Sequence, residues 1–510
     1  MQVQAIRMWL LAVVASLGGF LFGLDLGVMG PMLESAYFKR DVAHLVDWQD
    51  PSSEIPNDLQ GHLVSLFALG CLLTSIPHVS EYLTSSHGRV AAMAFASVVF
   101  ILGCWLQASS NAMWPMLLSR VISGSAVGIC GTVCVTYQTE IAPANKRGAM
   151  GTLFQLAITF GIFSAALLGY CFVDEEGGWR VARYLHIVPA AVLLLSTPFM
   201  PSSPRWLVQE GRPDEALTVL RLIRTDGDAR QEHFDMVSHQ EARSESKEES
   251  NVRRSRIGSR FNALTMKYLG VAFTILLLVQ FNGMAVFYYF GPRIFKEFGF
   301  GQHMNLLNAV AAGVNFLATV PAVGLVDVCG RRVFLMLGSL GMALIQIAMG
   351  CIGSFGLTAG DTQEMWVAYV VFSLVCAFKI LFAISWGAIG LLYCTEMLPT
   401  RIRSFGLGFA SLATWGGNYL MALFTPILLG TIGYSLFWIL AGICLFGFFF
   451  AMRLPETKGQ KLEDLEARFE TFFGHRSKGE AGSETKGDVE GDAADEASSS
   501  TAGVVLKVEV

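Results

Sequence analysis

The feature that most constrains the fold of this chain is a series of long apolar stretches that recur along its 510 residues. There are about a dozen, each of about 18–25 residues, which is enough for an α-helix to cross a ~30 Å hydrocarbon core. Only 15% of the residues are charged, against about 25% in soluble proteins. The chain is therefore predicted to be an all-α membrane protein. We expect transmembrane helices near residues 8–30, 59–79, 90–108, 113–138, 149–172, 184–200, 267–290, 305–326, 333–355, 366–394, 404–430 and 432–452.

Lysine and arginine are distributed unevenly between the connecting segments, and this asymmetry predicts the orientation. One side is poor in them and carries Lys39, Arg40, Arg180, Arg183, Arg293 and Lys296. The other side is rich in them and carries Arg89, Lys146, Arg147, a dense group in 201–267, Arg331, Arg332, Arg401 and Arg403. Both termini are therefore predicted to lie in the cytoplasm, and we expect the plasma membrane as the location.

Short motifs repeat between the two parts of the chain. YQTEIAPANKRG (137–148) corresponds to YCTEMLPTRIRS (393–404), HGRV (87–90) to DVCGRRV (327–333), and PSSPRWL (201–207) to PETKGQKL (455–462). Three pairs in one order, at an offset of roughly 250 residues, predict a parallel duplication of six spans, as in transporters with two like-oriented halves.

The duplication sets the expected domain boundaries. An N-terminal six-helix bundle at 1–200 is followed by a cytoplasmic linker with short helices at 201–266. A C-terminal six-helix bundle at 267–452 is followed by a cytoplasmic tail at 453–510. Because the tail is rich in Gly, Ser, Ala and Glu, we expect it to be disordered after about residue 474.

The repeated motifs place charged residues at the predicted cytoplasmic ends of helices. Arginines there can donate to terminal helix carbonyls and pair with nearby glutamates. Such pairs can hold the two halves together on the cytoplasmic side and break when that side opens; the alternative is anchoring by positive charge alone. The residues of this predicted gate are Arg89, Glu140, Arg147, Asp327, Arg331, Arg332, Glu396 and Arg403.

Together with these repeats, GGFLFGLDLGV (18–28), RVISGSAVG (120–128), FQLAITFGI (154–162) and PETKGQKLEDLE (455–466) carry a family resemblance. Over roughly residues 8–465 the chain resembles the sugar porter family of the major facilitator superfamily. PSSPRWL departs from the family, with Ser202 where Glu is usual. The resemblance implies 12 transmembrane helices in two six-helix bundles around a central cavity that works by alternating access.

Amide side chains in the predicted spans are candidates for sugar binding, because an amide both donates to and accepts from hydroxyl groups while remaining uncharged. Hydrogen bonding between helices is the alternative role. The candidates are Gln155, Gln280, Asn282, Asn315 and Asn418, and by resemblance all but Asn282 fall on the family's sugar-contacting positions.

The seventh span departs from the family pattern, since VQFNGMAVFYY (279–289) is one residue short and puts Met284 where the family has Asn. Asn282 can substitute only if the helix shifts or bulges. By resemblance, Tyr288 and Tyr289 form the pair that closes the outer side of the cavity; as amphipathic aromatic residues they could equally be interfacial.

The tenth span also departs from the family. Leu391 replaces the Trp on which a sugar ring commonly stacks, and Gly387 and Gly390 are expected to supply its flexible breaks. Lys379 lies four residues before Ala383, a position that lines the cavity in the family, so the two share a helical face. Lys379 either snorkels to the outer headgroups or faces the cavity, where it would suit a ligand with negative charge.

Asp25 lies in the middle of the first span, where an ionised carboxylate costs several kcal/mol or more. It has three interpretations: a helix-breaking polar residue held by Gly23 and Gly27, a sugar ligand, or a proton carrier. Arg120 is the family's partner for this position, and by resemblance an acid here is typical of proton-coupled members. Low dielectric favours the neutral acid and a nearby arginine the ionised one, so protonation and pairing can alternate and bias the conformation.

The sequence thus predicts a secondary transporter of a monosaccharide, hexose-like, coupled to proton symport through Asp25 and Arg120. The alternatives are a facilitative sugar or polyol uniporter, a transporter of a charged sugar-related solute or organic acid, and a non-transporting nutrient sensor. No enzyme site, nucleotide-binding loop or metal-ligand spacing is evident. We expect no cofactor and no nucleic-acid partner, and the lipid bilayer as the surroundings.

Overall fold

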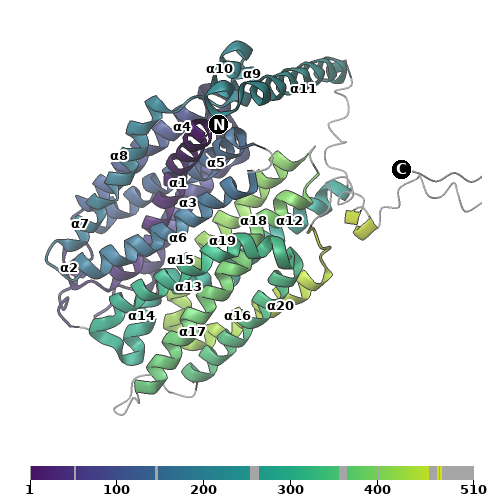
Figure 1. Ribbon diagram of the computed structural model, residues 1–510. Coiled ribbons are helices and arrows are strands. Elements are labelled where there is room, and N and C mark those ends of the chain that lie inside the picture. Colours follow the sequence, from purple (N-terminus) through teal and green to yellow (C-terminus); the bar gives the residue numbers. More distant parts are fainter. Residues whose placement is uncertain are drawn as a thin grey trace, which may run out of the picture.

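The structure, a computed structural model, describes residues 2–50, 53–143, 147–252, 263–354, 365–399, 402–458, 468–469 and 471–473. The regular elements of these residues are helices, and no strand occurs among them (Figure 1). The tail predicted to be disordered after about residue 474 lies outside the described residues.

The N-terminal bundle contains six spans. Its elements are α1 (Gln2–Glu34), the short α2 (Ala36–Asp41), α3 (Asn57–Ser75), α4 (Pro77–Ala108), α5 (Met113–Ile141), α6 (Arg147–Phe172), α7 (Gly178–Leu185) and α8 (Ile187–Ser196). The last two form one span that is interrupted at His186. This span begins several residues before the predicted 184, so Arg183 lies within it and not in a loop.

Three short or amphipathic helices follow: α9 (Pro204–Gln209), α10 (Pro213–Ile223) and α11 (Asp226–Val252). They lie at the same end of the molecule as the N-terminus (Figure 1). We call this the linker end, and the opposite end, which carries α2 and α14 (Gly291–Phe295), the far end.

The C-terminal bundle also contains six spans, two of them interrupted. Its remaining elements are α12 (Ala263–Phe281), α13 (Met284–Tyr289), α15 (Met304–Cys329), α16 (Arg331–Ser354), α17 (Met365–Ile384), α18 (Trp386–Met397), α19 (Arg403–Ile432) and α20 (Leu436–Arg453). The break between α12 and α13 lies at Gly283, whose φ of 94° favours glycine. The break between α17 and α18 lies at Ser385. The expectation that Gly387 and Gly390 supply it was wrong, since both lie inside the continuous helix α18.

Hydropathy is consistent with twelve spans. Within the described residues, ten helical stretches are long and apolar enough to cross a membrane. One of them, Phe405–Arg453, contains both α19 and α20. The twelfth span, α3, is not among the ten; its first turns carry polar residues such as Asp58, Gln60 and His62.

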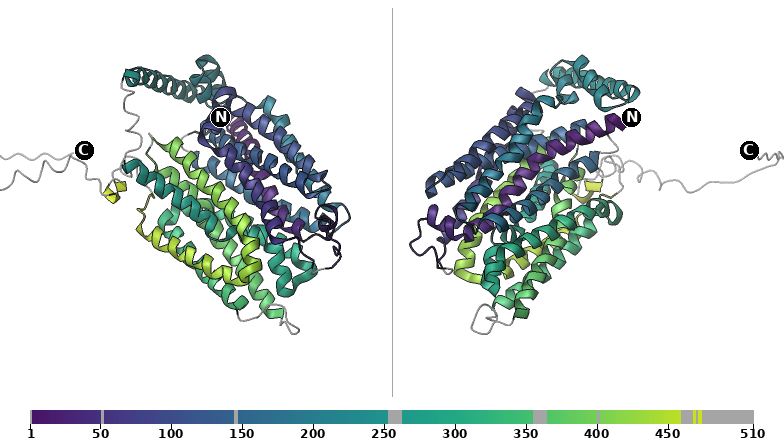
Figure 2. Two further views of the ribbon diagram at one scale, coloured as in Figure 1. Left: turned by 180° about the vertical axis from the view of Figure 1, so that it is seen from behind. Right: turned by 60° about the vertical axis from the view of Figure 1, so that its left-hand side comes forward.

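The two bundles lie side by side (Figures 1 and 2). α3 packs against α19 and α6 against α15, so the interface joins the second span to the eleventh and the fifth to the eighth. Within the N-terminal bundle, α1 packs closely along α6, because a Cβ atom at Gly23 or Gly27 would collide with backbone atoms of α6. α1 is continuous through this region, so the interpretation of Asp25 as a helix breaker was wrong.

Candidate functional site

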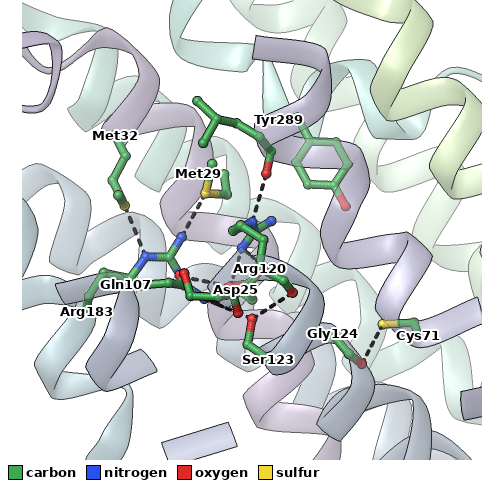
Figure 3. A network of polar contacts seen from close by, with 12 residues as sticks. Asp25, Met29, Met32, Cys71, Gln107, Arg120, Ser123, Gly124, Arg183 and Tyr289 are labelled. Atoms are coloured by element: carbon green, nitrogen blue, oxygen red, sulfur yellow. Dashed lines mark hydrogen bonds and ion pairs between the residues drawn. The ribbon is translucent and has the colours of Figure 1, made fainter. Parts of the chain in front are cut away.

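The centre of the N-terminal bundle contains a fully buried ion cluster (Figure 3). Asp25 projects from α1, and Nη1 of Arg120 on α5 donates to its Oδ1 at 2.6 Å. Nη1 of Arg183 on α7 donates to the same oxygen at 2.7 Å. Arg120 therefore pairs with Asp25 as predicted. Arg183, which was predicted to lie in a loop, is a second partner of the same carboxylate.

The rest of each guanidinium has weaker partners. Nε of Arg120 donates to the carbonyl oxygen of Leu63 at 2.8 Å. The central guanidinium carbon of Arg120, Cζ, lies 4.8 Å from the centre of the Phe67 ring. Arg183 contacts the sulfur atoms of Met29 and Met32 at 2.7 and 3.2 Å. We call Asp25, Arg120 and Arg183 the ion cluster; it contains two cations and one anion.

His186 is a further polar group of this region that sequence reasoning missed. It is fully buried at the junction of α7 and α8, within electrostatic reach of all three charges of the ion cluster. In the described part of the chain neither of its ring nitrogens has a hydrogen-bond partner. The only sequence signal for it was a histidine near the start of an apolar stretch.

Three of the predicted side chains form one network in the C-terminal bundle. Nδ2 of Asn418 on α19 donates to Oε1 of Gln280 on α12 at 3.2 Å. The hydroxyl of Tyr289 on α13 donates to Oδ1 of Asn418 at 3.1 Å. We call these residues the amide network. Tyr289 also lies within electrostatic reach of Arg120 and Asp25, beside the ion cluster in Figure 3.

Asn315 and Tyr288 form a second contact nearby. Nδ2 of Asn315 on α15 donates to the hydroxyl of Tyr288 at 3.2 Å. The ammonium of Lys379 on α17 lies 5.5 Å from the centre of the same Tyr288 ring. Lys379 is buried, so it does not snorkel to the headgroups.

The two other predicted amides do not join these contacts. Gln155 on α6 is half-buried, and its side chain makes no hydrogen bond to another described residue. Asn282 lies at the break that its predicted role required, but its Oδ1 accepts from the backbone N–H of Met284 at 3.0 Å. Its carbonyl oxygen accepts from Gln346 on α16, so Asn282 serves the interior of its own bundle.

Trp415 on α19 is a residue of the bundle interface that sequence reasoning missed. Its ring contacts the Phe22 ring of α1 edge-on, with 5.1 Å between the ring centres. Phe22 in turn stacks on Phe67, the ring that lies against Arg120. An aromatic side chain therefore stands between the bundles although Leu391 replaces the tryptophan expected on the tenth span.

At the linker end, the predicted gate residues pair within each bundle. Arg89 and Glu140 form an ion pair of 2.8 Å in the N-terminal bundle, and Arg331 and Glu396 one of 3.0 Å in the C-terminal bundle. The Arg332 guanidinium donates to the carbonyl oxygen of Met452, as expected for a helix end. The side chains of three further predicted gate residues lie outside the described part: Arg147, Asp327 and Arg403.

At the far end, polar contacts connect the two bundles. Glu34 at the end of α1 accepts from Lys296 of the C-terminal bundle at 2.9 Å. Arg293 on α14 contacts Glu54 at 3.1 Å and Asn57 at 3.0 Å. We call Glu34, Glu54, Asn57, Arg293 and Lys296 the far-end bridge. The sequence signal for it was the sparse charge in loops on this side, which we used only to predict orientation.

Two groups beside the far-end bridge show how closed this end is. Burial lowers the pKa of Lys39, which also contacts Glu34. Burial raises the pKa of Asp174, which accepts a hydrogen bond of 3.0 Å from Asn305 of the other bundle. In the described residues, ion pairs between the bundles occur at the far end and not at the linker end.

Comparison with known proteins shows which family this chain belongs to. The model of the family described as "Sugar (and other) transporter" matches residues 11–469. The chain is 30% identical to a D-xylose transporter of Levilactobacillus brevis over 89% of this chain and 93% of that protein. It is 28% identical to an arabinose-proton symporter of Bacillus subtilis over 90% and 94% of the two chains.

The fold also matches solved structures. The inward-open conformation of the xylose transporter XylE from E. coli superposes with a TM-score of 0.71 and 25% identity, over 90% of this chain and 99% of that one. The match confirms the predicted all-α fold of twelve transmembrane helices in two six-helix bundles. The relatives and the solved structures are sugar transporters, in agreement with the prediction that this chain is a transporter and not an enzyme. The chain belongs to the sugar transporter family.

Proposed function

We propose that this chain carries a monosaccharide across a membrane by alternating access, together with a proton that Asp25 binds and releases. The observation that carries this proposal is the ion cluster: a fully buried carboxylate, paired with Arg120, in the first span of a sugar transporter. Intramembrane carboxylates are costly, and their usual roles are proton relays and substrate pathways.

The amide network supplies groups for an uncharged polyhydroxylated ligand. Gln280 and Asn418 present donors and acceptors without a net charge, and each can bind neighbouring sugar hydroxyls. Gln155, half-buried on α6, and Asn315 are proposed to complete the site from the two sides of the interface between the bundles. Asn282 is better assigned to the helix break.

Tyr289 links the proposed sugar site to the proposed proton site. It donates to Asn418 in the amide network and lies beside Arg120 and Asp25 of the other bundle. A protonated Asp25 no longer holds its arginines as an anion does, so protonation changes the groups that Tyr289 meets across the interface. The similarity to an arabinose-proton symporter supports this coupling.

Orientation and location complete the proposal. The positive residues of the linker end place it, with both termini, in the cytoplasm, and we propose the plasma membrane as the site of action. Residues 1–200 and 267–452 are the two moving bodies, and residues 201–266 join them. The far-end bridge closes the outer side, and the pairs Arg89–Glu140 and Arg331–Glu396 are proposed to form part of the cytoplasmic gate.

The test is transport by the purified full chain in liposomes, with radiolabelled D-xylose and D-glucose and an imposed inward proton gradient. Asp25→Asn cannot cycle a proton, so gradient-driven accumulation should be lost while exchange against preloaded sugar continues. Asp58→Asn, which changes an exposed carboxylate on α3, is the matched control and should accumulate sugar like the wild type.

Three results would count against parts of this proposal. Unchanged accumulation in Asp25→Asn would remove the proton role of Asp25. A wild type that equilibrates sugar without accumulating it would be a uniporter. A wild type that binds sugar but moves none in either assay would be a sensor and not a carrier.

A further inference from the structure

Lys379 is a buried cation that the proposed function does not use. It is 1% exposed on α17, whereas the adjacent Ile380 is 40% exposed. Lys379 therefore faces away from the lipid, into the interior of the C-terminal bundle. This position excludes snorkelling, which requires the ammonium to reach the headgroups.

The ammonium has no anionic partner within the described part of the chain. The ammonium lies over the face of the Tyr288 ring, 5.5 Å from the ring centre, and within electrostatic reach of the uncharged Cys376 thiol. An aromatic face replaces only part of the hydration that a buried ammonium loses. A lysine buried at this depth without a carboxylate is therefore expected to meet a ligand that carries negative charge.

Two polar groups at the Tyr288 ring have hydrogen-bonding capacity that no described residue uses. Oδ1 of Asn315 is buried and accepts no hydrogen bond from any described residue. The Tyr288 hydroxyl accepts from Asn315 at 3.2 Å, which leaves its own proton free to be donated. We call Tyr288, Asn315 and Lys379 the lysine cluster; it offers one ammonium, one hydroxyl donor and one amide acceptor.

We propose that the lysine cluster binds the carboxylate of a sugar acid, so that hexuronates or aldonates are among the monosaccharides that this chain carries. The carboxylate accepts from Nζ of Lys379 and from the Tyr288 hydroxyl, and a hydroxyl of the same molecule donates to Oδ1 of Asn315. Tyr288 and Tyr289 follow one another on α13, and the remaining hydroxyls of the ligand are proposed to meet the amide network. This inference rests on the proposed transport function and specifies its substrate class.

The experiment uses probes that differ in one group. The measurement is inhibition of labelled-sugar uptake into liposomes at one pH. D-glucuronate is compared with D-glucose as the competitor, and D-galacturonate with D-galactose. In the wild type we expect each acid to compete at least as well as the neutral sugar. Lys379→Met should raise the concentration of acid needed for half-inhibition by about tenfold or more, since a charge-assisted hydrogen bond is lost, and leave the neutral sugars unchanged. Lys267→Met, which changes an exposed lysine of α12, is the matched control.

The outcomes separate this inference from the proposed function. Neutral sugars that compete while both acids fail in the wild type would overturn the inference and leave sugar transport intact; this comparison needs no variant and does not depend on how Lys379→Met folds. Acids that compete equally well in the wild type and in Lys379→Met would remove the role of Lys379. Failure of every sugar and acid to move or bind would overturn the transport function itself, and the inference with it.

Discussion

Asp25 divides its interaction between two guanidinium groups, which leaves the ion cluster with one more positive than negative charge. Arg120 has a backbone acceptor and an aromatic face in addition to Asp25. Arg183 has, besides Asp25, two methionine sulfurs, which are weak acceptors. The carboxylate is therefore the group on which both buried cations depend, and Arg183 is the less well compensated of the two.

This imbalance predicts the thermal stability of single and double variants of the ion cluster. Asp25→Asn removes the anion from two buried cations and should cost about 3 kcal/mol, or roughly 5 °C in melting temperature. Arg183→Met leaves a neutral pair and places an apolar side chain against Met29 and Met32, so it should change the melting temperature much less. The double variant should recover part of the loss.

The measurement is thermal unfolding of the purified chain in detergent, followed by intrinsic fluorescence. Arg180→Met is the matched control, because Arg180 is part-buried three residues earlier and bonds to Ala108 and Asn111 outside the ion cluster. If Arg180→Met rescued Asp25→Asn as well as Arg183→Met does, the charge imbalance would not be the cause.

At the scale of helices, apolar length predicted which segments span the membrane but not where they break. The break at Gly283 requires a positive φ that glycine tolerates, and the sequence offered only a missing residue as a signal. The sixth span begins at Gly178, several residues before the apolar stretch. The apolar stretch starts later because Arg180 and Arg183 occupy the first turns of the helix. A window of hydrophobicity excludes such residues, whereas the folded bundle pairs Arg183 with Asp25.

The break between α12 and α13 also determines which amides can meet a ligand. Gln280, before the break, faces Asn418; Asn282, at the break, faces its own bundle and holds the N–H of Met284. Gln280→Ala should therefore raise KM for sugar about tenfold, as expected for the loss of about 1–2 kcal/mol of hydrogen bonding. Asn282→Ala is the matched control. It should lower the melting temperature, because it removes the hydrogen bond at the helix break, and leave KM for sugar close to the wild-type value.

Concentration dependence of uptake into liposomes, with the melting temperature of each variant, checks this prediction. An Asn282→Ala variant that kept its melting temperature and lost affinity for sugar would return Asn282 to the binding site. Residue type and the resemblance named the four other amides as candidates. Which way Gln280 and Asn282 face could not be predicted, because it depends on a break in the backbone between them.

For the whole molecule, the sequence predicted two bundles and a gate of ion pairs at the linker end, whereas in the described residues the ion pairs that join the bundles lie at the far end. The repeated motifs explain the difference, since a duplicated motif places its arginine and glutamate in the same bundle, as in Arg89–Glu140 and Arg331–Glu396. Contacts between bundles join segments without sequence similarity, such as the end of α1 and the segment after α14. Nothing in a repeat indicates such pairs.

The far-end bridge predicts how the two conformations respond to the loss of one pair. Glu34 is almost fully buried and Lys296 partly exposed, so their ion pair should favour the closed far end by about 1 kcal/mol, or roughly fivefold in population. Lys296→Met should therefore open the far end more often. Asn308→Cys, at a residue that is buried on α15 in the closed form, reports this opening through its rate of labelling by a membrane-impermeant maleimide. The background is Cys171→Ser, Cys351→Ser and Cys376→Ser, which removes the described cysteines that are not buried.

Lys39→Met is the matched control for this measurement, because Lys39 contacts the same Glu34 from within the N-terminal bundle and does not join the bundles. We expect Lys296→Met to speed labelling several-fold and Lys39→Met to leave it close to the wild-type rate. The exchanged pair Glu34→Lys with Lys296→Glu should return labelling toward the wild type, since it restores attraction across the interface. Equal acceleration by Lys39→Met and Lys296→Met would mean that Glu34 stabilises the end of α1 and that other contacts hold the bundles together.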